Sequence, residues 1–273
     1  MKNFAKKPGF SSDTVYRMRK LILSITSIAL FGLLAILGCN SRGGGGTGPG
    51  DDQLFKIHGI FVRDVNSTGT KDKTSFQLKR SDTLFNLATL TIDTFTIDTV
   101  ADTTYYYRQS RPDFLRPGQS HSINLVYAPN SLNFTDSLLM PDSFSFIVTN
   151  PPNHQNTGAQ LVNIEWTGSA NAGGYLVFCS HDSALIDTSF FVTTGTTAAE
   201  IPADAFRIGG NPVSGLYNIF IVAYRGGLFP YTGMPFNLPS NYTPTDTTYS
   251  SIVSGRVGAA FICKLDTVRV PPP

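Results

Sequence analysis

An all-β fold is predicted by three features of this 273-residue sequence. Strong helix formers are scarce: Glu occurs only as Glu165 and Glu200, whereas Thr, Val, Ile, Phe and Tyr are common. Apolar residues recur at every second position in short segments, which is the side-chain period of a half-buried strand. Gly, Pro, Asn and Asp separate these segments at short intervals. We therefore expect two tandem β-sandwiches, preceded by a signal segment and a flexible tether, with 41% hydrophobic residues to fill their cores.

Residues 1–38 have the organisation of an export signal. Six basic side chains, the last of them Lys20, precede Leu21–Leu37, a mostly apolar run without a charged residue. A run of this length is also close to the lower limit for a transmembrane helix, so both interpretations have to be weighed. Translation from Met1 and translation from Met18 would both produce such a signal, and the sequence leaves the two open.

The residues that end this run decide in favour of the signal. Ile36-Leu37-Gly38-Cys39 resembles the lipobox of bacterial lipoproteins. The resemblance implies cleavage before Cys39 and acylation of both its thiol and the new amino terminus, which gives a lasting membrane anchor. Asn40 follows the cysteine, and in the sorting pattern of that family this implies the outer membrane of the cell envelope.

Residues 39–53 are predicted to be a Gly-rich tether. No strand precedes its glycines and no Lys-Ser/Thr follows them, so the segment does not have the features of a phosphate-binding loop. A random coil of this length spans about 20 Å on average. Residues 1–38 hold six of the 21 basic side chains and one of the 19 acidic ones. Residues 39–273 therefore have a net charge of about −3. With no basic block in that remainder, nucleic acid is excluded as a partner.

The first predicted module covers residues 54–142. Alternation predicts a strand over 54–62, and a change of phase at Asp93-Thr94 predicts a turn or a bulge between two short strand segments. Arg116-Pro117-Gly118 predicts a tight turn before another strand, over residues 123–127. This strand rhythm resembles the Ig-like modules of envelope lipoproteins, which implies an Ig-like β-sandwich.

The second predicted module covers residues 143–273 and is similar to a fibronectin type III domain. The similarity rests on Trp166 in a second strand over 162–166, on Gly174-Tyr175 opening a third, and on a sixth strand that contains Tyr217, Ile219, Ile221 and Ala223. It implies that Tyr217 is a tyrosine corner, with its hydroxyl bonded to the preceding loop. The last strand is expected over residues 257–265, so that the sixth strand separates Cys179 from Cys263 and both thiols stay unpaired.

A long insertion at residues 226–254 departs from the family pattern. Its aromatic residues are candidate contacts for a partner protein or a glycan: Phe229, Tyr231, Phe236, Tyr242 and Tyr249. Alternatively, these rings fold over the edge of the sandwich. We expect the insertion to be dispensable for folding, since long loops on rigid sandwiches commonly carry function.

The sequence gives no motif for catalysis, a metal or a cofactor. His58, His121, His154 and His181 lack the spacing of a helical zinc site, and no Cys-x-x-Cys occurs. His181-Asp182-Ser183 contains the residue types of a triad, but neighbours on an extended chain are expected to point apart. The function predicted is therefore a non-catalytic, lipid-anchored envelope protein whose modules act as spacers or protein-contact surfaces. Two alternatives remain: a glycan-binding surface lipoprotein that uses the insertion, and an enzyme subunit with an unrecognised site.

Overall fold

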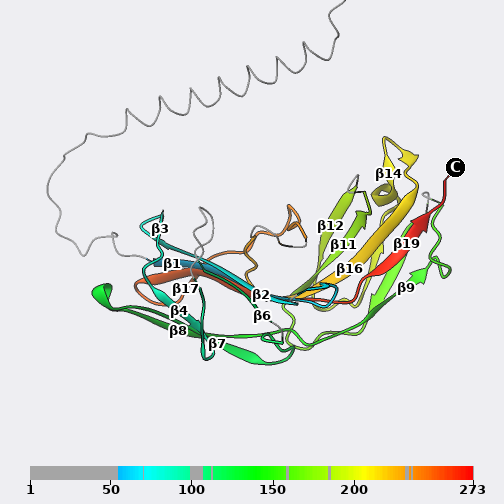
Figure 1. Cartoon of the computed structure of the whole chain (residues 1–273). Helices are drawn as coiled ribbons and strands as arrows, with labels where there is room; N and C mark the ends of the chain where they lie inside the picture. Colours follow the sequence, from blue (N-terminus) through cyan, green and yellow to red (C-terminus); the bar gives the residue numbers. More distant parts are fainter. Residues whose placement is uncertain are drawn as a thin grey trace, which may run out of the picture. The chain divides into compact units, whose positions relative to one another are not determined.

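The computed structural model describes residues 55–69, 71–98, 107–111, 113–157, 160–183, 186–230, 234 and 236–272. The predicted signal, Cys39 and the tether lie outside these residues. Within these ranges, no helix is both long and apolar enough to cross a membrane. Among the residues that the structure describes, the regular elements are strands apart from two short 3-10 turns, which confirms the predicted all-β class (Figure 1).

Eight strands and one 3-10 turn belong to the first half of the described chain. They are β1 (Phe55–Asp64), β2 (Asp72–Arg80), β3 (Thr83–Leu84), β4 (Thr89–Ile92), β5 (Phe95–Thr96), β6 (Tyr107–Arg111), β7 (Ser120–Tyr127), η2 (Ala128–Asn130) and β8 (Leu132–Leu139). The β4–β5 hairpin turns at Asp93, whose φ is +54°, and the turn before β7 closes with a hydrogen bond from Gln119 N–H to the Arg116 carbonyl. Both predicted turns are confirmed.

The second half contributes eleven strands and one 3-10 turn. They are β9 (Phe146–Asn150), β10 (Val162–Trp166), β11 (Gly174–His181), β12 (Asp187–Val192), β13 (Ala198–Ile201), η3 (Ala203–Phe206), β14 (Arg207–Ile208), β15 (Asn211–Pro212), β16 (Gly215–Gly226), β17 (Thr247–Thr248), β18 (Val253–Ile262) and β19 (Asp266–Val270). The strand predicted over 162–166 is β10, residue for residue.

One large sheet serves both sandwiches. Its strand order is β12-β11-β16-β18-β1-β2-β3, with β6 on β2, β17 on β18 and β19 on β16. The β5-β4-β7-β8 sheet covers one part of its inner face, and the β13-β10-β9 sheet covers another part. The predicted pair of β-sandwiches is therefore present, and the two are joined through a common sheet.

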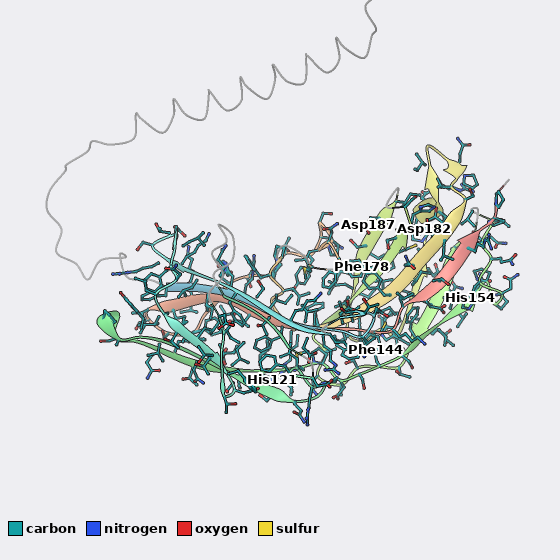
Figure 2. The ribbon with its side chains drawn as sticks, in the orientation of Figure 1. His121, Phe144, His154, Phe178, Asp182 and Asp187 are labelled. Atoms are coloured by element: carbon teal, nitrogen blue, oxygen red, sulfur yellow. The ribbon has the colours of Figure 1, made fainter. Side chains whose placement is uncertain are left out.

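The second sandwich has the features implied by its similarity to fibronectin type III domains. Trp166 on β10 points inward, and its ring lies 5.3 Å from that of Tyr175 on β11. Phe144, just before β9, packs between the sheets against Tyr175 and Phe261 (Figure 2). The hydroxyl of the fully buried Tyr217 donates a hydrogen bond to the carbonyl of Val213, 3.0 Å away. The predicted tyrosine corner is confirmed.

Strand β18 contributes to the cores of both sandwiches. Its inward residues alternate along the strand: Val253, Val257 and Ala259 pack in the first core, and Phe261 packs in the second. All ten residues of β1 pair with β18 in parallel, and β16 pairs with β18 on the other side. The domain boundary at 142/143 stays a prediction, but residues 253–259 of the second predicted module complete the core of the first.

The last predicted strand, over 257–265, is wrong in its bounds. The chain leaves the sheet register after Ile262, so β18 ends there and β19 begins at Asp266. Cys263 lies in the connection, where its N–H donates to the Ile221 carbonyl of β16. Cys179 faces Ile219 of the same strand from β11. The predicted strand order is confirmed, and both buried thiols are unpaired.

Candidate functional site

The predicted contact residues of the insertion lie in different surroundings. Tyr231 lies outside the described residues. Phe236 is 6% exposed, and its ring lies 4.9 Å from that of Phe178 on β11. Tyr249 packs beside the first core instead, with its ring 5.1 Å from that of Phe134 on β8. These side chains therefore do not form one common exposed patch.

Phe229 connects the insertion to the outer face of the large sheet. Its ring stacks on the imidazole of His58 on β1, with 4.9 Å between centroids, and the Arg256 guanidinium lies 5.7 Å from the same ring. His58 Nε2 is 3.2 Å from a carboxylate oxygen of Asp246 in the insertion. Burial lowers the pKa of His58, and the neighbouring Asp246 opposes that shift without cancelling it. The insertion is thus fixed to β1 and β18 by ring stacking and by charge.

We call the described residues of the insertion, 227–230, 234 and 236–252, the cover segment, because several of their apolar side chains complete a third core on the outer face of the sheet. The fully buried Leu228, together with Phe236, packs there against apolar residues of β1, β11, β16 and β18: Ile60, Val62, Leu176, Phe178, Val222, Ala260 and Ile262. The buried Leu228 and Phe236 count against the expectation that the insertion is dispensable for folding, which only a shortened or substituted chain can test. Removing it would expose the apolar outer face of the sheet to water.

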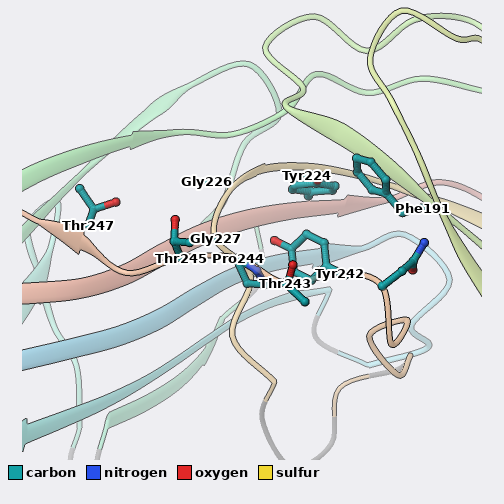
Figure 3. A pocket seen from close by; sticks show the side chains of 10 residues that line it. Phe191, Tyr224, Gly226, Gly227, Tyr242, Thr243, Pro244, Thr245 and Thr247 are labelled. Carbon is teal, nitrogen blue, oxygen red and sulfur yellow. The ribbon is translucent and has the colours of Figure 1, made fainter.

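A cleft of about 460 Å³ opens between the cover segment and the edge of the second sandwich (Figure 3). Its lining consists of Phe191 from β12, Tyr224 and Gly226 from β16, Gly227, Asn241, Tyr242, Thr243, Pro244, Thr245 and Thr247. The three rings gather at one end, and Pro244 with the threonines extends toward the other. A volume of this size lies within the usual range of about 300–1,000 Å³ for ligand pockets.

Two glycines bring the cover segment close to the sheet at the mouth of this cleft. Gly226 has a φ of +71°, a backbone conformation that favours glycine, and a Cβ there would overlap the carbonyl oxygen of Val257. Gly227 lies against the Arg256 side chain, and a Cβ added at Gly227 would lie only 3.0 Å from the Cβ of Arg256. The chain can therefore turn sharply at the end of β16, and the cover segment that follows can lie close to the outer face of the sheet.

The aromatic end of the cleft is rigidly positioned and uncharged. The hydroxyl of Tyr242 accepts a hydrogen bond from the Leu228 N–H at 2.8 Å, and its ring meets Tyr224 edge-on at 5.2 Å. Burial raises the pKa of Tyr224 and of Tyr242, so both phenols keep their protons at neutral pH. Phe191 completes the group with its ring 6.2 Å from that of Tyr224.

His181 is held by hydrogen bonds to two neighbouring turns. Contrary to the expectation that His181 and Ser183 point apart, a turn brings Ser183 Oγ within 2.7 Å of His181 Nδ1. The other ring nitrogen bonds the carbonyl of Ser214, and the imidazole is only 6% exposed. His181 therefore ties one turn to another. Among the described side chains, no three His, Cys, Asp or Glu residues gather closely enough to hold a metal ion.

Sequence reasoning found Tyr242 but missed the rest of the cleft. Phe191 and Tyr224 were indistinguishable from ordinary strand aromatics, because the side of the sheet they face depends on which segment covers it. Asn241 and the threonines carry no recognisable spacing. The density of Gly, Pro and Thr around residues 226–247 was the one available signal.

The sequence matches no protein-family model and none of the curated proteins. Among solved structures, the chain is similar to the FN1–FN3 domains of chicken CNTN1, with 8% identity and a TM-score of 0.25; the match covers 80% of this chain and 64% of that one. It is also similar to a segment of two fibronectin type III domains from chicken tenascin, with 16% identity and a TM-score of 0.23; here 60% of this chain and 90% of that one are covered.

Proposed function

We propose that this chain is a non-catalytic, lipid-anchored protein of the bacterial outer membrane, whose paired β-sandwiches present a protein-contact surface at a distance from the lipid. The observation that carries the proposal is the shared sheet. Because β18 packs into both cores and pairs with β1, residues 50–273 form a single compact unit instead of two freely jointed modules. Such a unit can hold a surface at a fixed distance from the point where its tether enters.

The lipobox-like residues support the anchor. Cys39 precedes β1 by 16 residues, and this stretch is rich in glycine. A random coil of that length spans about 20–24 Å, enough to clear the lipid headgroups. The lipid chains on Cys39 would supply the membrane affinity, since each buried CH₂ contributes about 0.8 kcal/mol.

Fractionation of Cys39→Ala tests the anchor. The variant should move from the membrane pellet to the soluble fraction, while Ser41→Ala, a matched change two residues further along the tether, should still pellet. A Cys39→Ala protein that pellets after a high-salt wash would refute lipid anchoring. Crosslinking in intact cells tests the contact surface: the wild-type chain should form a discrete adduct with an envelope protein, and Cys39→Ala should form much less of it.

A second candidate function is favoured by the cleft. Rings beside amide and hydroxyl groups, with no charged lining residue, suit a carbohydrate better than a peptide with charged side chains. In this alternative the chain is a glycan-binding surface lipoprotein.

A further inference from the structure

We propose that the cleft between β12, β16 and the cover segment binds an uncharged sugar ring, which packs on Phe191 and Tyr242 and bonds to Asn241 and the neighbouring threonines. This inference rests on the second candidate function and narrows it to one site and one class of glycan. Three features of the cleft support it: the placement of its rings, its polar groups and the absence of charge from its lining.

The rings supply flat apolar surface that is already in place. Tyr242 is fixed by its hydrogen bond with Leu228 and by its contact with Tyr224, which is only 8% exposed. Phe191 lies at an angle of 48° to Tyr224 and is half-buried, so part of its ring remains accessible. A sugar ring presents C–H groups on its face, and these pack well on aromatic rings. Since the rings need not move, little ordering cost opposes binding.

The polar groups are suited to hydroxyl ligands. Asn241 offers two N–H donors and a carbonyl acceptor, and each threonine hydroxyl can donate and accept. Asn241, Thr243, Thr245 and Thr247 are all exposed and line the cleft. Thr243 lies beside Tyr242, and Thr245 and Thr247 follow toward the other end (Figure 3). Sugar hydroxyls both donate and accept as well, so these side chains can satisfy them in more than one orientation.

The charged side chains near the cleft have protein partners. The Arg256 guanidinium donates to the carbonyl of the lining residue Pro244 at 2.9 Å. Asp246 lies between two lining threonines, but its carboxylate is directed to His58 and Arg256, at 3.2 and 3.9 Å. The Arg225 guanidinium donates to the carbonyl of Asn171 at 3.2 Å. No lining residue carries a formal charge. A carboxylated or sulfated sugar would therefore lose hydration without meeting a cation among the lining residues, so an uncharged ring is preferred.

Calorimetric titration of the mature chain in detergent tests the inference. The probes are uncharged trisaccharides of glucose, mannose and N-acetylglucosamine, together with trigalacturonate as the charged comparison. At least one uncharged probe should bind more tightly than trigalacturonate. Asn241→Ala should weaken its binding by about fivefold or more, the usual effect of one lost hydrogen bond. Phe191→Leu, which keeps an apolar side chain but removes the flat face, should weaken it similarly.

Two neighbouring variants serve as controls. Ser240→Ala precedes Asn241 outside the lining, and Phe190→Leu changes the adjacent β12 residue, which packs against the second core. Both should bind as the wild-type chain does, and all four variants should retain a cooperative thermal transition. If a glycan binds but Asn241→Ala and Phe191→Leu bind it unchanged, or if only trigalacturonate binds, this inference fails while the glycan-binding function survives. If no probe binds, both fail.

Discussion

Replacing Phe236 by Ala should destabilise the whole unit, because the cover segment is part of the hydrophobic core. The side chain is 6% exposed and lies against Phe178 within the third core. Phe→Ala changes in cores cost about 3–5 kcal/mol. Because the Phe236 side chain keeps some contact with solvent, we expect a loss at the lower end of this range, about 3 kcal/mol.

That loss translates into a measurable shift. For a unit of about 200 residues, 1 kcal/mol corresponds to roughly 2–4 °C in melting temperature, so Phe236→Ala should melt about 6–12 °C lower. Ser240→Ala, an exposed change in the same segment, should stay within about 0.5 kcal/mol of the wild-type chain. Near-ultraviolet circular dichroism during heating measures both. A shift below about 2 °C for Phe236→Ala would refute the assignment of the cover segment to the core.

Tyr217→Phe should cost about 0.5–1.5 kcal/mol of unfolding free energy in denaturant titrations, since it removes the part-buried hydrogen bond to the Val213 carbonyl. Burial lowers the pKa of His58 in the folded chain, so the unfolded chain takes up its proton first as the pH falls. The free energy of unfolding should therefore decrease below about pH 6.5, and less steeply in His58→Gln. Thiol titration of the denatured, unreduced chain should find both Cys179 and Cys263 free, because β16 lies between β11, which carries Cys179, and the β18–β19 connection, which carries Cys263.

A specific result would refute each of these three predictions. An unchanged denaturation midpoint in Tyr217→Phe would show that its hydroxyl contributes nothing to the corner. Parallel pH profiles for His58→Gln and the wild-type chain would remove the imidazole as the cause of the slope. An intramolecular disulfide found by mass spectrometry would overturn the strand order around β16.

The elements predicted from sequence were those whose signals are local. Val162–Trp166 alternates with period two, and Asp93 offers the left-handed turn conformation that a short hairpin requires. Tyr217 was identified because the residues around it follow a family pattern. In each case the decisive information lies within ten residues of the feature.

The remainder depends on pairings between distant residues. Nothing in the sequence of Val253–Ile262 specifies β1 as its parallel partner, because the two strands lie nearly 200 positions apart and each resembles any apolar strand. The cleft has the same difficulty, since Phe191 and Tyr224 acquire a common surface only when the cover segment crosses the sheet. The contact between His181 and Ser183 was missed because their segment turns where an extended chain was assumed.

The position of β1 also determines how the protein bears force. Lipid anchoring would make the tether the point of load, and the described fold begins at Phe55, the first residue of β1. This strand is held by β18 along one side and by β2 along the other. A pull along the strand axis must shear both rows of hydrogen bonds together, whereas an edge strand could be peeled away one bond at a time. Mechanical strength is therefore concentrated where the chain would be pulled, and single-molecule stretching from the N-terminus should meet its highest rupture force at β1.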